Sequence, residues 1–391
     1  MASLIEFITA NLSEATFFKE LCFMGQKFAV VETGEFELAD VFIWLESDGI
    51  IIQVKKRHEN EPADQAGFDK WFNKKVQSKG SDQIADTLAF FKRHPSVIVK
   101  NARGLDFELR QLNAATMHKL IVFGTLADGV AQHHHSKFRI SERSGFIHLI
   151  QAVDFGNLLQ CTVTPGEMLE YLGFREQCVQ QWAVANQRTE KWLFGCFVHW
   201  SDSGRDPECL DEAEGEATVD ALADDTGQSN LRFFFDHLGQ WAATTANAKN
   251  FARIIIELAH LPRSEARMFK ERLVRYLRRT DLPFPDTLYR VLNPKRDCLI
   301  VLSVPPRGTV DEVEKRSASI LLMAKYAARV SKAMGIFFSS FGNEHVGTTA
   351  ICVEGPWEQS LEADAAIAEF PILQRPLKAV RARAYSLKTG K

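Results

Sequence analysis

Three polar residues stand at one end of two apolar runs in the stretch from Phe36 to His58, FELADVFIWLESDGIIIQVKKRH. Asp40 precedes the first run, and Gln53 and Lys55 close the second. Alternate side chains of a strand face the same side, so Gln53 and Lys55 would project together. If the two runs pair as a hairpin, an acid, an amide oxygen and a lysine converge. This combination suits metal-dependent hydrolysis of a phosphodiester.

Oxygen atoms at this end of the hairpin would hold a hard cation such as Mg²⁺ or Mn²⁺, which prefers oxygen ligands. The candidate ligands are the Asp40 carboxylate, the side-chain oxygen of Gln53 and the backbone carbonyl of Val54. The metal would lower the pKa of a water molecule and neutralise phosphate charge. Lys55 would position that water or stabilise the developing negative charge.

The elements that position these residues follow from the pattern. Ser47–Gly49 favours a tight turn, which makes the two apolar runs an antiparallel hairpin. With the turn centred on Asp48 and Gly49, Asp40 falls opposite roughly position 57, near enough to Lys55 for a twist or bulge to close the gap.

A further acid would come from the segment before the hairpin. NLSEATFFKELCF, residues 11–23, has the apolar spacing of a helix. Glu14 is the first candidate for a helix acid, although a first-turn acid that complements the helix dipole explains it nearly as well. Glu20 and Glu37 are the alternatives.

After the hairpin, residues 68–94 predict a helix interrupted near Gly80, and HKLIVFGTL at residues 118–126 predicts an apolar strand. Together with a further strand and helix, the order over the first 180 residues is α-β-β-β-α-β-β-α. Helices packed on a mixed sheet follow from that order.

The pattern Glu14, Asp40 and Gln53-Val54-Lys55, in this order of elements, resembles the PD-(D/E)XK nuclease superfamily. The resemblance covers roughly residues 1–160 and implies a restriction-endonuclease-like αβββαβ core. It implies that Asp40 binds metal, that Lys55 is the catalytic lysine and that Glu14 is the helix acid. It also implies contacts to nucleic acid from the basic segment after the hairpin and the helix that follows it. The residues are Lys56, Lys74, Lys75, Lys79 and Gln83.

Two positions depart from the family pattern. Ala39 stands before Asp40 where proline is usual, and Gln53 replaces a carboxylate, which removes one negative charge from the metal site. Asp40 as a strand-start residue and Lys55 as a surface lysine of the run KKRH are the plainer alternatives.

The remainder, residues 181–391, predicts an α/β accessory domain of undetermined role. EKWLFGCFVHW at residues 190–200 reads as a strand, and residues 201–229 form an acidic, Gly- and Ser-rich insertion expected to be a loop. Helices and strands alternate after it.

The net charge of −3 gives no global basic field, so nucleic-acid binding would rest on local patches. Seven scattered cysteines without a CxxC pair favour a reducing compartment and argue against a disulfide framework and a cysteine zinc site. Neither a signal peptide nor an apolar run of roughly 18 residues is present, so we expect a cytoplasmic protein without membrane contact.

The sequence therefore predicts an α/β endonuclease that hydrolyses phosphodiester bonds with Mg²⁺ or Mn²⁺, on DNA in preference to RNA, with a role in bacterial antiviral defence by analogy only. The alternative is an inactive nuclease-fold module that binds nucleic acid or assembles proteins. A homodimer and an activating partner protein both stay open.

Overall fold

The computed structural model describes residues 9, 13, 18–30, 34–46, 48–57, 64–94, 96–101, 103–110, 116–124, 135–204, 210–223, 248–278, 288–305, 308–341, 345–375 and 377–379. The chain forms two compact units, Met1–Asp236 and His237–Lys391. The first unit thus extends past the boundary expected near residue 180. Each unit combines a β-sheet with helices, so the protein is mixed α/β. Among the described residues, no helix has the length and apolar character of a membrane span.

The first unit is built on a six-stranded mixed sheet with strand order β1-β4-β5-β8-β10-β9. Strands β1, β4 and β5 are antiparallel neighbours, β8 is parallel to β5, β10 is parallel to β8, and β9 is antiparallel to β10. The strands are β1 (Cys22–Met24), β4 (Val41–Leu45), β5 (Asp48–Lys56), β8 (Met117–Gly124), β9 (Phe138–Ser141) and β10 (Gly145–Gln151). Two separate hairpins are β2 (Lys27–Val30) with β3 (Gly34–Glu37) and β6 (Ser96–Lys100) with β7 (Asp106–Arg110).

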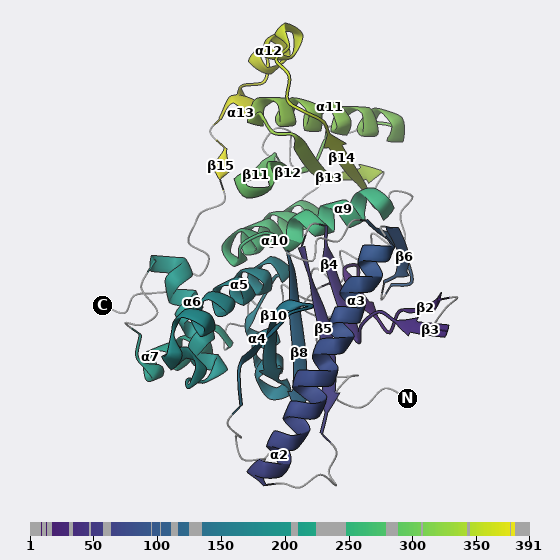
Figure 1. The fold of residues 1–391 in the computed structure, drawn as a ribbon. Helices are drawn as coiled ribbons and strands as arrows, with labels where there is room; N and C mark the ends of the chain where they lie inside the picture. The colour runs from purple at the N-terminus through teal and green to yellow at the C-terminus, as the bar shows by residue number, and fades with distance from the viewer. Residues whose placement is uncertain are drawn as a thin grey trace. The chain divides into compact units, whose positions relative to one another are not determined.

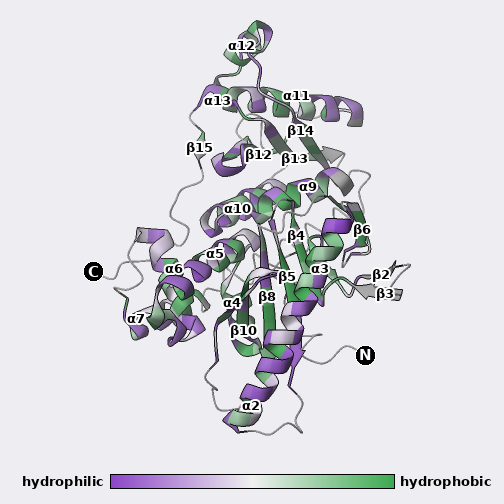
Figure 2. Ribbon diagram, viewed as in Figure 1, coloured by the Kyte–Doolittle hydropathy of each residue, from purple (hydrophilic) through white to green (hydrophobic). Residues whose placement is uncertain are grey.

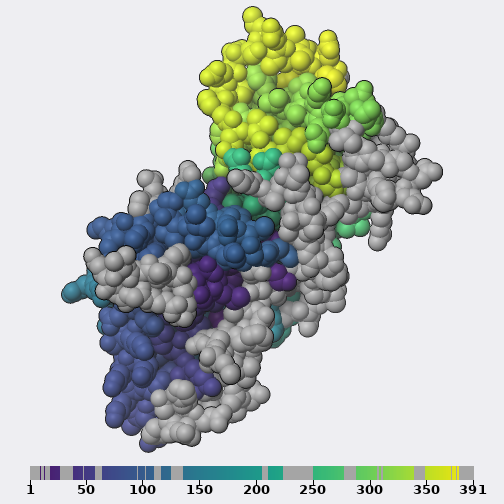
Figure 3. Space-filling view, turned by 90° about the vertical axis from the view of Figure 1, so that its right-hand side faces the viewer, coloured from purple at the N-terminus to yellow at the C-terminus, as the bar shows by residue number. Residues whose placement is uncertain are grey.

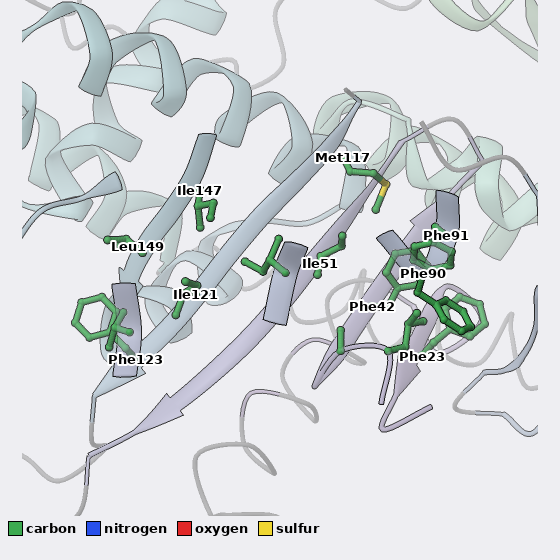
Figure 4. Close-up of a cluster of buried hydrophobic side chains, with 14 of the residues drawn as sticks. Phe23, Phe42, Ile51, Phe90, Phe91, Met117, Ile121, Phe123, Ile147 and Leu149 are labelled. Atoms are coloured by element: carbon green, nitrogen blue, oxygen red, sulfur yellow. The ribbon is translucent and has the colours of Figure 1, made fainter. Parts of the chain in front are cut away.

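One face of this sheet is covered by a continuous helical rod. The rod consists of α2 (Gln65–Trp71), the π-helix η1 (Phe72–Gly80) and α3 (Ser81–Arg93), and it runs across the strands in Figure 1. Asp64 caps its start by accepting the N–H of Gly67. Side chains of the rod pack with Phe42, Ile51 and Ile121 of the strands in the core shown in Figure 4. Figure 2 shows hydrophobic stretches in the strands and alternating hydrophilic and hydrophobic residues along the rod.

The other face is covered by helices that follow β10. They are α4 (Ala152–Cys161), α5 (Pro165–Gln181), α6 (Glu190–Ser203) and α7 (Glu212–Ala223), with a short 3₁₀ turn at Ala183–Asn186. The predicted start of α5 is confirmed, because Thr164 caps it and Pro165 occupies its first turn.

Two expectations in this region are wrong. The segment expected to be a strand at residues 190–200 is helix α6, which Thr189 caps by accepting the N–H of Trp192. An apolar run that is buried nearly all round does not distinguish strand from helix by periodicity, and the cap decides here. The acidic insertion contains helix α7, which packs on α6, while residues 205–209 and 224–229 lie outside the described part.

The helix expected over residues 11–23 is wrong at its C-terminal end. Phe18 has a φ of 63°, Lys19–Leu21 form a turn, and Cys22 begins strand β1. Residues 10–12 and 14–17 lie outside the described part.

The second unit has a five-stranded sheet of order β14-β13-β12-β11-β15. The strands are β11 (Tyr289–Asn293), β12 (Cys298–Ser303), β13 (Lys332–Phe341), β14 (His345–Glu354) and β15 (Lys378–Ala379). Helices α11 (Val310–Ala328), α12 (Leu361–Ala368) and α13 (Pro371–Gln374) enclose one core with the sheet. Helices α9 (Ala248–Ala259) and α10 (Arg263–Arg278) contact the sheet as well.

Helices α6 and α7 cross at two glycines, and we predict that their contact tolerates no side chain. A Cβ at Gly195 would overlap the backbone carbonyl of Gly215, which cannot move without shifting α7. Gly195→Ala should therefore lower the free energy of unfolding by about 2 kcal/mol, measured by urea denaturation. Gly173→Ala in α5 is the matched control, since nothing lies within 4 Å of its Cβ, and it should stabilise by about 0.5 kcal/mol. Equal effects of both variants would contradict the close helix crossing.

Candidate active site

The register of the β4–β5 hairpin differs from the sequence expectation. Val41 pairs with Ile52 and Leu45 with Asp48, so Asp48 and Gly49 belong to β5 rather than to the turn. One step beyond the Val41–Ile52 pair, Asp40 lies opposite Gln53 and not opposite position 57. The correction brings the acid closer to the predicted partners, without any need for a bulge.

Four groups meet at this end of the hairpin. Asp40 Oδ2 accepts the backbone N–H of Val54 at 2.6 Å. The Lys55 ammonium donates to Gln53 Oε1 at 3.3 Å and to the Val54 carbonyl at 3.1 Å. Gln53 is 3% exposed, whereas Asp40 and Lys55 are half-buried and open to solvent. The structure therefore brings together all the predicted hairpin residues.

The helical rod passes over these residues at close range. A Cβ at Gly80 would lie 2.7 Å from Cδ1 of Ile121, which is the neighbour of Gln53 across the β5–β8 ladder. Two turns later, the Thr87 hydroxyl donates to the carbonyl of Leu38, two residues before Asp40. The rod thus crosses the strand ends that carry the candidate site.

Gln83 lies on the rod between these two contacts. Its backbone carbonyl also accepts the Thr87 hydroxyl, and its side-chain oxygen is buried without a hydrogen-bond partner in the described part of the chain. A buried amide oxygen without a donor is costly, so this oxygen is available to a cation or to a donor. The Gln83 side chain is thus directed inward and not displayed on the outer side of the rod.

The donor set fits a hard divalent cation. The Asp40 carboxylate, Gln53 Oε1 and the Val54 carbonyl are all oxygens, which Mg²⁺ and Mn²⁺ prefer. Two of these oxygens converge on the Lys55 ammonium, which shows that a cation can reach both from one position.

Of the three candidates for the additional acid, the structure excludes one. Glu20 is buried in an ion pair with Arg103. Because Cys22 pairs with Ile43, Glu20 lies beside the far end of β4, about 17 Å along the strand from Asp40. Glu14 lies outside the described residues, and of Glu37 only the backbone in β3 is described.

The predicted basic residues lie on the surface. Lys56, Lys74, Lys75 and Lys79 are exposed, and in Figure 3 the violet-blue atoms of the rod lie on the outer surface of the first unit. Arg57, which follows β5 in the basic run KKRH, is instead buried with its guanidinium over the ring of Phe68.

A buried group of charged residues, which the sequence pattern did not predict, occupies the opposite face of the sheet. We call it the Arg175 hub; its members are Lys137, His148, Tyr171, Arg175 and Glu190. Arg175 is fully buried and donates all five of its N–H groups: to both Glu190 oxygens, the carbonyls of Lys137 and Leu149, and His148 Nδ1. The signal in the sequence was an arginine inside the apolar face of a helix, which a fixed partner must satisfy.

Electrostatics hold the hub in its charged form. Burial would raise the pKa of Glu190, but the charges of Arg175 and Lys137 and the hydrogen bonds from Arg175 and Tyr171 outweigh it and lower that pKa to about 2. Burial lowers the pKa of His118 to about 4, and burial together with Arg175 lowers that of His148 well below its ordinary value. Both imidazoles are therefore neutral near pH 7.

His118, His148 and Glu176 each offer one ligand atom, and these atoms lie within 4.8 Å of one another, a spacing that could hold a metal ion. The hydrogen bonds favour another interpretation. Because Arg175 donates to His148 Nδ1, the ring carries its proton on Nε2, which lies 3.4 Å from His118 Nδ1. A metal-binding histidine needs a hydrogen-bond acceptor, not an arginine, behind the ring. His148 and His118 thus form a hydrogen-bonded pair that extends the Arg175 hub.

No family model, no curated protein and no solved structure matches this chain.

We predict that the Arg175 hub is a major source of stability for the first unit. Glu190→Gln removes the charge that Arg175 and Lys137 require, and should lower the free energy of unfolding by about 3–5 kcal/mol in urea denaturation. The loss should stay constant between about pH 5 and about pH 8. The lowered pKa makes Glu190 stabilising above its ordinary value of 4.5, and that stability declines as the pH falls toward 2.

Glu212→Gln is the matched control, because the Arg188–Glu212 pair is 39% and 42% exposed and should contribute less than about 1 kcal/mol. A similar small loss for Glu190→Gln would show that the buried charges are satisfied in another way.

Proposed function

We propose that this protein is a metal-dependent nuclease that hydrolyses phosphodiester bonds of DNA. The observation that carries the proposal is the meeting of Asp40, Gln53, the Val54 carbonyl and Lys55 at one solvent-accessible end of a hairpin. A carboxylate and two neutral oxygens beside a lysine combine metal ligands with a group that stabilises negative charge.

The order of elements supports the proposal. The antiparallel strands β1, β4 and β5 are followed by the helical rod and then by β8, parallel to β5. This is the succession expected of a restriction-endonuclease-like core, with the candidate residues at the start of its second strand and the end of its third. The hairpins β2–β3 and β6–β7 are additions to that succession.

The roles of the residues follow from their contacts. Asp40, Gln53 and the Val54 carbonyl would hold a divalent cation, which lowers the pKa of a water molecule and neutralises charge on the phosphate. The hydrogen bond from Val54 N–H fixes the orientation of the Asp40 carboxylate. Lys55 donates to a phosphate oxygen or to the attacking water, and Gln83 contributes an amide oxygen from the rod.

The π-helix gathers the exposed lysines into one patch. A π-helix has about 4.4 residues per turn, so around the helix axis Lys79 projects between Lys74 and Lys75, and the three side chains span an arc of about 80°. In an α-helix the same three side chains would span about 140°. The acids of the next helix, Asp82 and Asp86, pair with Arg143. The lysine patch can therefore follow a phosphate backbone.

A reducing, cytoplasmic setting is part of the proposal. The described cysteines are buried or half-buried thiols, which suits such a compartment. A defence role extends the proposal by analogy alone.

We predict that cleavage depends on the hairpin residues. With Mg²⁺ or Mn²⁺, wild-type protein should cut plasmid or single-stranded DNA, and Asp40→Asn and Lys55→Ala should each lower the rate by at least about 100-fold. The matched controls are Asp106→Asn and Lys92→Ala, which change exposed residues on β7 and α3. Circular dichroism checks that each variant is folded. Equal rates in all five proteins would locate the activity elsewhere, and cleavage of RNA alone would change the substrate.

We also predict that the lysine patch contributes uniform, salt-dependent affinity. Lys74→Gln, Lys75→Gln and Lys79→Gln should each weaken DNA binding at every sequence tested and reduce the slope of log affinity against log salt by about 1. Fluorescence anisotropy at several salt concentrations measures both quantities. An unchanged slope in the triple variant would place the nucleic acid on another surface.

A further inference from the structure

The contacts of Lys55 set up a competition within the candidate site. Its ammonium lies 3.1 Å from the Val54 carbonyl and 3.3 Å from Gln53 Oε1, the two neutral oxygens of the donor set. One position cannot hold an ammonium and a metal ion together, because both are cations and need the same lone pairs. Lys55 must therefore turn away when a divalent cation takes these oxygens.

The charges at this end of the hairpin favour Lys55 in that competition. Asp40 supplies the one carboxylate among the described residues of the site, and Gln53 is neutral where the resembled pattern has an acid. A divalent cation would add two positive charges beside that of Lys55, and the neutral amide of Gln53 offsets none of them. Gln53 thus lowers the attraction of these oxygens for a metal ion.

A phosphodiester changes this balance. It brings one negative charge, and its oxygens offer Lys55 charge-assisted hydrogen bonds that replace those to Gln53 and Val54. The two neutral oxygens then become available to the cation. Because such coupling is reciprocal, the metal must strengthen phosphate binding by the same factor.

We propose that Lys55 and a divalent cation compete for Gln53 Oε1 and the Val54 carbonyl, and that the phosphodiester decides the competition by taking over the Lys55 ammonium. This inference rests on the proposed function and adds regulation to it. The cation and the nucleic acid bind together, so metal alone does not load the enzyme.

The test measures Mn²⁺ affinity from the electron paramagnetic resonance signal of unbound Mn²⁺, with the full chain. Affinity is compared without nucleic acid, with a cleavage-resistant phosphorothioate DNA duplex or its RNA counterpart, and with an uncharged methylphosphonate duplex. Wild-type protein should bind Mn²⁺ at least about tenfold more tightly with the phosphorothioate duplex or its RNA counterpart, and no more tightly with the uncharged one.

Two variants isolate the cause. Lys55→Met removes the competing ammonium and Gln53→Glu restores a carboxylate, so each should bind Mn²⁺ at least about tenfold more tightly than wild type without nucleic acid. Gln53→Glu keeps the test decisive if Lys55→Met does not fold, and Lys92→Met, an exposed lysine at the end of α3, should match wild type.

The outcomes separate the two proposals. Tight Mn²⁺ binding by wild type that is equal with and without nucleic acid overturns the competition but keeps the metal site. Unchanged affinity in both variants also overturns the competition. Absence of Mn²⁺ binding in every protein and condition overturns the proposed function and, with it, this inference.

Discussion

The pairing of β4 with β5 is the constraint on which the candidate site depends. With Val41 opposite Ile52, the next pair sets Asp40 against Gln53, and the hydrogen bond from Val54 N–H to the Asp40 carboxylate holds that end of the hairpin. A slip of one residue would move every side chain of β5 to the other face of the sheet. Burial of Ile51 in the core beneath the rod resists such a slip, so packing and the position of the polar groups are fixed together.

The two faces of the sheet support the candidate site in different ways. On the site's face, close approach at Gly80 brings the π-helix onto Ile121 and carries Gln83 over the strand ends. On the other face, the Arg175 hub joins β10, α5, α6 and Lys137, the residue before β9, through hydrogen bonds that use all five N–H groups of Arg175. A site needs supporting elements that do not shift when charge changes nearby, and a satisfied buried network supplies such support.

Gln53 links the architecture to the proposed chemistry. A neutral amide costs less to bury than a carboxylate, which suits a side chain that is 3% exposed. The same neutrality lowers the attraction for a metal ion and leaves the Lys55 ammonium as the favoured cation at these oxygens. Stability of the hairpin end and the proposed dependence on an incoming phosphate thus both follow from the amide at position 53.

The sequence by itself determined the α/β class, the hairpin, the apolar strand β8, the cap of α5 and the residue types of the candidate site, because periodicity and capping are local properties. It did not determine the hairpin register, the helical state of α6 or the end of the first segment at Phe18. Turn geometry decides the register of the hairpin and the end of the first segment. Burial on nearly all sides of the apolar run leaves periodicity unable to distinguish a helix from a strand at α6. Only the tertiary structure brought Gln83 over the strand ends and assembled the Arg175 hub, since contacts between residues far apart in sequence depend on how layers pack.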